Sequence, residues 1–151
     1  MRKECFICRK HKGLENIPGG AIFEDELVYI SHAQLWKNET KHYLGHVFVE
    51  PKRHLPLLAD LTKEESQAIG YFTSLVAKAL VEILSVEHVY SFVLGHHIDH
   101  VHVHIIGRYP GAPREYWGIK VDEWPDAPRG RAIEIEKIAE KISDFINLEL
   151  K

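Results

Sequence analysis

The sequence predicts a single α+β domain over residues 1–151, with an antiparallel sheet and two helices. Three observations carry this prediction. The chain has 151 residues, which is an ordinary size for one domain and enough to bury one core. Short apolar and β-branched runs follow one another at hairpin distances. Two longer segments, one central and one C-terminal, carry apolar residues at helical spacing.

Four segments have the composition of strands. Residues 27–30 follow an acidic turn, and residues 46–50 form an apolar run that Pro51 ends. Residues 89–94 predict a third strand and residues 101–106 a fourth, both rich in β-branched residues. The short gaps between these segments favour antiparallel pairing.

The two helices are predicted from their first turns and apolar faces. Thr62 and Glu65 form a capping box, in which each side chain accepts from the backbone of the other. The apolar face of the helix that follows consists of Ile69, Phe72, Val76, Ala79 and Ile83. The last helix begins near Arg131, and its apolar face consists of Ile135, Ile138, Ile142 and Phe145.

Two segments carry no regular pattern. Residues 1–20 are polar and contain turn signals. Residues 107–130 are rich in glycine, proline, arginine and tryptophan, and a connection this long is usually functional or disordered. The aromatic residues Tyr116, Trp117 and Trp124 favour an ordered, packed segment.

Composition limits the classes of function. The formal net charge is −3 with histidine neutral, so general nucleic-acid binding is not expected, because it needs clustered lysine and arginine. No run of 18 or more apolar residues is present, and we expect no membrane span. The N-terminal residues lack the apolar core of a secretion signal, so we expect a cytoplasmic protein.

Three histidines alternate with valines in the segment His100-Val101-His102-Val103-His104. This alternation predicts a half-buried strand with the three imidazoles on one face, about 6.6 Å apart. A core gains nothing from three chargeable rings in a row, which favours a chemical role. Two interpretations remain open. The row could ligate a catalytic metal, or one ring could attack phosphorus while its neighbours orient it.

Two blocks of sequence resemble the histidine triad (HIT) superfamily. Residues 100–106 match its signature of three alternating histidines followed by two apolar residues, and residues 45–54 resemble its second block, a strand ending in Pro-Lys-x-His. The Cys5-x-x-Cys8 pair, the capped helix and Arg108 also fit. The resemblance implies a five-stranded antiparallel sheet with a long central helix and a C-terminal helix. It also implies a homodimer.

The resemblance assigns roles to three histidines. His102 would be the nucleophile that attacks the α-phosphorus of a nucleotide and forms a nucleotidyl-histidine intermediate, which water then cleaves. His104 would contact the phosphate and the leaving group. His46, on the second strand, would support the nucleophile.

A structural zinc site is also implied by the resemblance. Some family members bind zinc through a cysteine pair and two histidines, at positions filled here by Cys5, Cys8, His54 and His100. Two thiolates and two imidazoles form a closed tetrahedral site. The alternatives are a redox pair, or free thiols with His54 at a strand end.

The chain departs from the family pattern at two places. The connection before the triad holds no asparagine or glutamine for the α-phosphate, and His96 or His97 could donate in their place. Residues 33–44 form a longer connection than usual, in which Lys37, Lys41 and His42 could meet extra phosphates or lie in a solvated loop. Arg108 is a further candidate phosphate ligand, with Arg114 and Arg129 as additional phosphate partners.

The resemblance therefore predicts a phosphohydrolase or nucleotidyl transferase that acts on a nucleotide, with adenine as the expected base. The leaving group is either a polyphosphate, as in diadenosine polyphosphate hydrolases, or an amine, as in nucleoside phosphoramidases. The arginines and the connection 33–44 favour the polyphosphate slightly. Two alternatives are a zinc-containing adaptor that binds nucleotides without significant catalysis, and a metallohydrolase with the triad as ligands.

Overall fold

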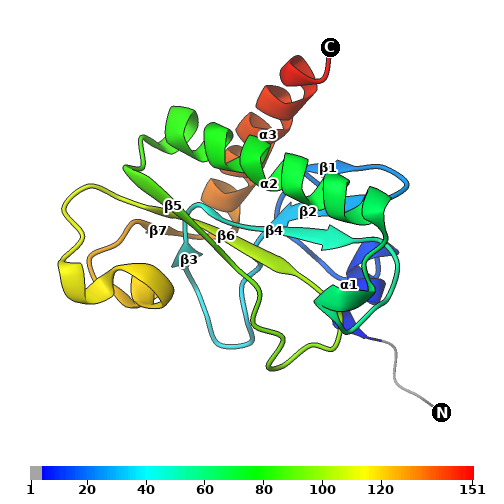
Figure 1. The fold of residues 1–151 in the computed structure, drawn as a ribbon. Coiled ribbons are helices and arrows are strands. Elements are labelled where there is room, and N and C mark those ends of the chain that lie inside the picture. Colours follow the sequence, from blue (N-terminus) through cyan, green and yellow to red (C-terminus); the bar gives the residue numbers. More distant parts are fainter. Residues whose placement is uncertain (1–4) are drawn as a thin grey trace.

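A computed structural model describes residues 5–151, and the four N-terminal residues lie outside that description. The main sheet has five strands in the order β1-β2-β4-β6-β5, and every neighbouring pair is antiparallel (Figure 1). The strands are β1 (Phe23–Glu24), β2 (Val28–His32), β4 (His46–Pro51), β5 (His88–Phe92) and β6 (Val103–Arg108). A separate ribbon pairs β3 (His42–Tyr43) with β7 (Arg129–Gly130). The predicted α+β class and five-stranded sheet are confirmed.

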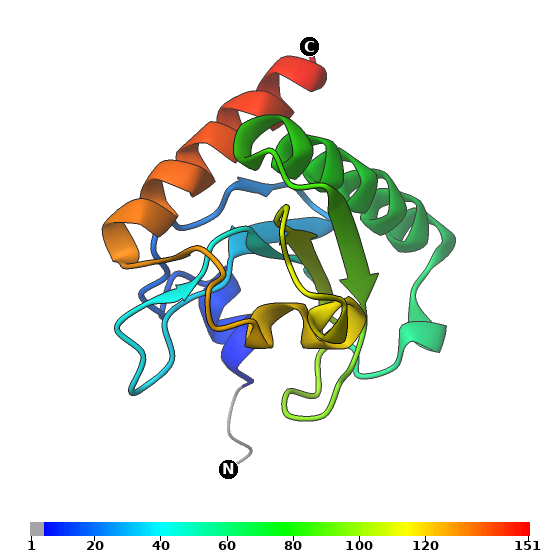
Figure 2. The ribbon, with the colours of Figure 1, turned by 90° about the vertical axis from the view of Figure 1, so that its left-hand side faces the viewer.

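The two long helices cover one face of the sheet. They are α2 (Lys63–Leu84) and α3 (Ala132–Glu149), which meet above the strands like the sides of a roof (Figure 2). The short helix α1 (Phe6–His11) lies on the opposite side of the sheet. The arrangement leaves one face of the sheet for the core and the other for side chains that do not pack against α2 and α3.

Alternation along the central strands sorts side chains between these two faces. On β4 and β6, one set of alternate residues packs against α2 in the main core: Val47, Val49, Val103 and Ile105. The other set faces away from α2 and includes His46, Phe48, Glu50 and His104. Because side chains alternate along a strand, a fully apolar inner face fixes the histidines on the outer one.

The predicted starts of the two long helices agree with the structure. Oγ1 of Thr62 accepts from the backbone of Glu65, and the Glu65 carboxylate accepts from the backbone of Thr62, which confirms the capping box. The predicted apolar face of α2 lies in or against the core. Helix α2 is long and apolar enough to cross a membrane by length and composition alone, a test that the core helix of a globular domain also passes.

Two predicted strands have different limits in the structure. The third ends at Phe92 instead of Leu94. The fourth runs over residues 103–108 instead of 101–106. His100 and His102 precede it because the chain bends there toward the loop after β4, where the backbone N–H of Val101 donates to the carbonyl of Leu55. The three histidines are therefore not one continuous row on a strand.

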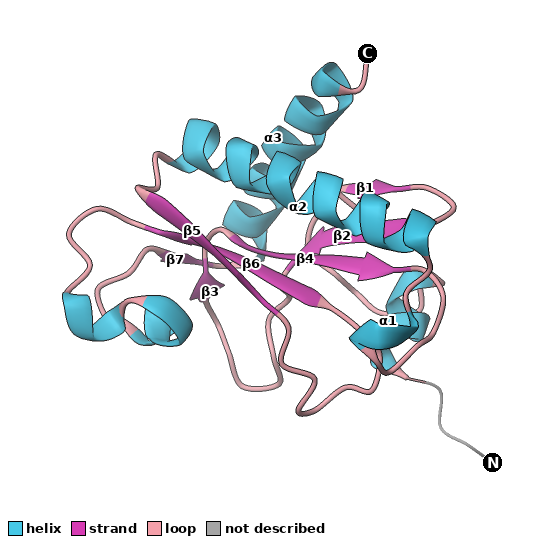
Figure 3. Cartoon of the chain, viewed as in Figure 1, coloured by secondary structure: helices cyan, strands magenta, loops and turns pink. Residues whose placement is uncertain are grey.

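Residues 107–130 are ordered, as their aromatic content predicted. They contain two short 3₁₀ segments, Arg114–Tyr116 and Gly118–Glu123, which lie beyond the end of β6 (Figure 3). A third 3₁₀ turn, Leu58–Asp60, leads into α2. Val121 is buried in a small second core with Tyr43 and Ile106, which ties the segment to the ribbon and to β6.

Candidate functional site

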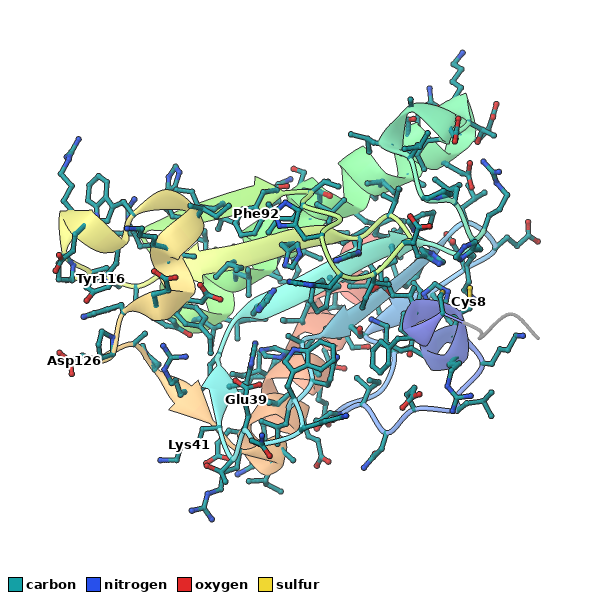
Figure 4. The ribbon with its side chains drawn as sticks, turned by 90° about the horizontal axis from the view of Figure 1, so that it is seen from below. Cys8, Glu39, Lys41, Phe92, Tyr116 and Asp126 are labelled. Carbon is teal, nitrogen blue, oxygen red and sulfur yellow. The ribbon has the colours of Figure 1, made fainter. Side chains whose placement is uncertain are left out.

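Cys5, Cys8, His54 and His100 meet where α1 approaches the loop after β4; Cys8 is labelled at one side of the sheet in Figure 4. Their ligand atoms all lie within 4.8 Å of one another. Sγ of Cys5 lies 3.5 Å from Nδ1 of His100, and Sγ of Cys8 lies 3.4 Å from Nδ1 of His54. Tetrahedral zinc bonds of usual length place sulfur and nitrogen ligands about 3.6 Å apart. The cluster therefore fits a metal ion.

Surrounding groups orient this cluster. Nε2 of the buried His100 donates to the carbonyl of Pro51 at 2.8 Å, which leaves Nδ1 free as a ligand atom. The backbone N–H of Cys8 lies 3.1 Å from Sγ of Cys5 and donates to it. These contacts fix the tautomer of His100 and orient the sulfur of Cys5.

His102 lies next to this cluster but has another environment. Nδ1 of His102 donates to the carbonyl of His100 at 2.7 Å. That bond fixes the tautomer, because a neutral imidazole carries only one N–H, and it leaves the lone pair on Nε2. The ring packs edge-on against Phe48 and lies 5.0 Å from the ring of His104, centre to centre.

His104 joins β6 to β4 through a second imidazole. Nδ1 of His104 lies 3.0 Å from Nε2 of His46. In the β4–β6 pairing His104 is directly opposite Phe48, so His46 is its diagonal neighbour, two residues along β4. The ring of Phe92 on β5 stacks on His104 at 5.1 Å. Contacts from the two strands that flank β6 therefore hold His104 in place.

A cavity of about 640 Å³ opens over these rings. His102, His104 and His46 form part of its wall. Its apolar lining comes from separate segments: Phe6 and Ile7 on α1, Trp36 in the 33–44 connection, Phe48 on β4, and Leu94 and Ile98 before β6. A site with apolar walls and a few convergent polar groups is typical for a small organic ligand.

Comparison with known proteins agrees with this geometry. The family model of the HIT domain matches residues 15–111, which is more than half of the chain. The chain belongs to the HIT family. A purine nucleoside phosphoramidase of Escherichia coli (strain K12) is 23% identical over 103 residues, which cover 64% of this chain and 82% of that protein.

Solved structures of HIT proteins have the same fold. A zinc-bound histidine triad family protein from Mycobacterium smegmatis has a TM-score of 0.70 at 18% identity, with 97% of each chain covered. A histidine triad nucleotide-binding protein from Sulfolobus tokodaii also has a TM-score of 0.70, at 20% identity, with 95% of this chain and 93% of that one covered. The family resemblance and the fold predicted from the sequence are thus confirmed.

Burial keeps two of the HIT histidines neutral. Desolvation, and after it the nearby ring of His102, lowers the pKa of His104 to about 4. The pKa of His46 falls well below its usual value, first because of burial and then because His42, His104 and other imidazoles surround it. At neutral pH both rings therefore act as neutral donors and acceptors.

The structure places the other predicted site residues as follows. His96 and His97 line the cavity. Arg108 does not: its guanidinium contacts Glu87 and Tyr90 and stacks on Trp117 at 3.7 Å. Its predicted contact with phosphate has no support in this geometry.

The remaining basic candidates lie away from the cavity or have other partners. Arg114 lies 4.6 Å from the same tryptophan ring, and Arg129 donates to two carbonyl groups of the 107–130 segment. Lys37 and Lys41 are exposed, and Figure 4 shows Lys41 in the outer part of the 33–44 connection. His42 is buried, and both of its ring nitrogens have hydrogen-bond partners within the protein.

The triad is not a metal-ligand set in this structure. His100 turns its Nδ1 toward the cysteines, whereas His102 and His104 line the cavity. Within residues 5–151, the only group of side chains arranged to hold a metal is the Cys₂His₂ cluster. The metallohydrolase alternative therefore has no support here.

Sequence analysis missed several residues of the cavity wall. Gln34 is buried there, and its Oε1 has no hydrogen-bond partner among the described residues. Lys10 and Glu50 form a fully buried ion pair at 2.7 Å. Burial opposes ionisation of Glu50, yet Lys10 and His11 outweigh it and lower the pKa of that carboxyl. Glu50, a carboxylate at the end of the apolar run 46–50, was the one signal that the sequence offered.

Proposed function

We propose that this HIT protein cleaves a nucleotide at its α-phosphate through a covalent bond between phosphorus and Nε2 of His102. One observation carries the proposal: the His100 carbonyl binds Nδ1 of His102, and the lone pair of Nε2 is left in a ring that lines the cavity. A neutral, oriented imidazole is a good nucleophile at pH 7. The reaction class is hydrolysis, or nucleotidyl transfer when an acceptor other than water enters.

The roles of the neighbours follow from their positions. Nε2 of His102 attacks phosphorus, the leaving group departs, and water later cleaves the bond between phosphorus and nitrogen. His104 lies beside the nucleophile, and its Nδ1 is engaged by His46, so its Nε2 is the atom available to the leaving group. His96 and His97 are the candidates for contact with the phosphate oxygens.

The cavity favours a purine nucleotide as substrate. Its apolar side chains offer stacking and packing surfaces for a flat base, and the free amide oxygen of Gln34 is an acceptor for a hydroxyl or amino group. The Escherichia coli relative named above is a purine nucleoside phosphoramidase, a name that points to a purine base and to a phosphorus–nitrogen bond. That relative favours an amine leaving group, whereas the arginines that favoured a polyphosphate lie outside the cavity.

We also propose that the Cys₂His₂ cluster holds zinc in a structural role. The sulfur–nitrogen distances suit tetrahedral zinc, and the HIT protein from Mycobacterium smegmatis is zinc-bound. With four protein ligands the ion keeps no open position, so it would supply folding energy and no activated water. A homodimer is a further part of the proposal, and it rests on family resemblance together with the open edge of β5.

The test compares two substrates and two variants. Purified protein should release AMP from adenosine 5′-phosphoramidate and from diadenosine triphosphate, with the amine substrate preferred. His102→Asn should lower kcat for both by more than about 1,000-fold while its circular dichroism spectrum stays unchanged. A nucleotidyl adduct on His102, trapped by an alkaline denaturing quench in which the phosphorus–nitrogen bond is stable, should appear in the mass spectrum of the wild type.

Two results would contradict the proposed function. Tight binding of AMP without turnover of either substrate would support the adaptor alternative. Retention of a tenth of the wild-type kcat in His102→Asn would exclude this residue as the nucleophile. His88→Asn is the matched control, because His88 is an exposed imidazole outside the cavity, and it should keep full activity.

A further inference from the structure

A chain of hydrogen bonds links the cavity to the outside through three imidazoles. Nδ1 of His104 meets Nε2 of His46 at 3.0 Å, and Nδ1 of His46 meets Nε2 of His42 at 3.0 Å. Nδ1 of His42 in turn lies 3.1 Å from a carboxylate oxygen of Glu39. We call these four residues the imidazole chain. It begins at a ring in the cavity wall and ends at a carboxylate whose side chain is 33% exposed.

The order of nitrogens gives the chain two complementary states. Each ring uses one nitrogen toward the cavity and the other toward Glu39, so every N–H in the chain can point the same way. In one state all N–H groups point inward and Nε2 of His104 carries a proton. In the other state they point outward and Nε2 of His104 has a lone pair.

Burial disfavours a positive charge on the two inner rings of the chain, those of His46 and His104. His46 is 6% exposed and surrounded by other imidazoles, and His104 is partly buried beneath Phe92. Burial lowers the pKa of both rings, as described above. The carboxylate of Glu39 is a suitable partner for a cation only at His42, the outer end of the chain.

We propose that His42 and Glu39 are positioning residues that hold, between turnovers, the proton that Nε2 of His104 gives up in the first half-reaction and takes back in the second. The proposal rests on the proposed function, because it assigns the source and the destination of a proton in that reaction. Neither residue touches the substrate: His42 acts through His46, and Glu39 acts through His42.

The protons balance over one turnover. As the bond from phosphorus to the leaving group breaks, His104 gives its Nε2 proton to that group. His46 then gives a proton to Nδ1 of His104, and His42 gives one to Nδ1 of His46, so that an imidazolium at His42 becomes neutral. When water attacks the nucleotidyl group on His102, its proton travels outward along the same bonds. Cleavage of the phosphorus–nitrogen bond restores neutral His102 and the His42 imidazolium.

The position of His42 depends on the unusually long connection 33–44. That connection forms β3, which pairs with β7 and thereby places His42 beside His46. His42 is 8% exposed, and both ring nitrogens are already engaged, so it has no nitrogen left for a substrate phosphate. The hydrogen bonds thus replace the phosphate contact that the sequence suggested.

Other charged groups near His42 do not compete for its nitrogens. His32 on β2 is buried, and its ring nitrogens contact the carbonyl of Ala33 and the backbone N–H of Gly45. Arg129 on β7 donates to carbonyl oxygens of Asp122 and Trp124. Lys41 is exposed beside it in sequence. Glu39 is therefore the carboxylate partner of this ring in the described structure.

Leaving groups of different basicity provide the kinetic test. A general acid matters for a basic amine or alkoxide but little for p-nitrophenolate, which leaves without a proton. His42→Phe should lower kcat/KM for an adenosine 5′-alkylphosphoramidate about 100-fold. It should lower kcat/KM for the p-nitrophenyl ester of AMP by less than about threefold, because p-nitrophenolate leaves without a proton. Glu39→Gln should act in the same direction with a smaller loss, and Glu39→Asp should recover most of it.

Lys41→Gln is the matched control, because it changes an exposed neighbour in the same connection, and it should leave both substrates unaffected. Equal losses for both substrates in His42→Phe would mean that His42 only supports the fold, and would overturn the proposal. Unchanged activity on the amine substrate would overturn it as well.

A measurement without substrate separates this proposal from the proposed function. In protein labelled with ¹⁵N-histidine, scalar couplings across the two N–H···N bonds should link His42 to His46 and His46 to His104. His42→Phe should abolish the first coupling. If wild-type protein hydrolyses no nucleotide but the couplings are present, the proposed function fails while the hydrogen-bonded chain stands. Absence of the couplings in the wild type would remove the basis of the proposal.

Discussion

At the residue scale, tautomers and burial decide what each imidazole can do. His100 and His102 have adjacent positions in the motif but opposite tasks, because the first offers Nδ1 to the cysteines and the second binds a carbonyl through Nδ1. Burial disfavours protonation of the rings of His46 and His104. The proposals above thus give one residue type three different roles within one motif: ligand, nucleophile and proton carrier.

Buried neutral histidines make stability depend on pH. The folded-state pKa of His104 is about 4, below the value of about 6.5 for an unfolded histidine. The unfolded chain therefore binds the proton first, and the stabilising contribution is complete above pH 6.5 and is lost as the pH falls toward 4. His46 acts in the same direction. We expect Tm, measured by calorimetry, to fall across this range.

Comparison with a variant isolates this contribution. His104→Gln removes the titrating ring, so its Tm should fall less steeply between pH 6.5 and 4 than that of the wild type. Metal release at low pH affects both proteins alike and cancels in the difference. Parallel curves for the two proteins would show that His104 is not held neutral by the fold.

Gln34 offers a second test at this scale. Its buried amide oxygen has no partner among the described residues, which costs stability in the free protein but provides an acceptor for a ligand. Gln34→Leu should leave Tm equal or higher and raise KM about tenfold, with kcat little changed, because one hydrogen bond to bound substrate is lost. Gln67→Leu, an exposed glutamine on α2, is the control. A lowered Tm with unchanged KM would exclude this role.

The sequence predicted some site residues and not others for a physical reason. His102 and His104 stand in a short motif with a regular period, His46 stands in the second block at residues 45–54, and the structure brings the three together. Gln34, Lys10 and Glu39 reach the site only because separate segments fold over one face of the sheet. No local spacing encodes such contacts, so they become visible only with the tertiary structure.

At the element scale, elements with strong local signals were predicted best. Helix α2 has both a capping box and a long apolar face, and its start agrees with prediction. Helix α1 has only six residues and no apolar period of its own, so it was missed. The β3–β7 ribbon was missed because each strand has two residues and its partner lies far away in sequence. Helix α1 and the β3–β7 ribbon both depend on contacts between residues that are distant in sequence.

Helix α1 connects the Cys₂His₂ cluster to the cavity. Cys5 caps the helix and Cys8 lies within it, while Phe6, Ile7 and Lys10 form part of the cavity wall. The double variant Cys5→Ser, Cys8→Ser should therefore lower Tm and raise KM. Because His102 keeps its own contacts, kcat of the folded fraction should stay within roughly tenfold of the wild type.

The measurement needs activity per folded molecule, with folding followed by circular dichroism at the assay temperature. Metal analysis should find close to one zinc per wild-type chain and none in the double variant. If kcat instead falls to background and added zinc restores it in partly stripped wild type, the ion takes part in catalysis and its structural role is wrong.

At the scale of the whole molecule, the sheet has one long edge that the fold leaves open. Strand β5 is the outer neighbour of β6, and its far side has no partner among the described residues. Val93, directly after this strand, is 39% exposed. An open edge with apolar side chains invites pairing with another chain, and a second copy related by a two-fold axis would satisfy it on both sides.

The proposed homodimer gives a test of this edge. Wild-type protein should sediment as a dimer, and Val93→Glu should shift it to the monomer, because the substitution places an unpaired carboxylate in a desolvated contact in each subunit. Leu148→Glu is the matched control, since Leu148 is 68% exposed near the end of α3 and far from β5 in the fold. A dimer that survives Val93→Glu but dissociates in Leu148→Glu would move the interface to α3. A wild-type monomer at all concentrations would mean that the edge of β5 stays open in solution, and would contradict the proposed homodimer.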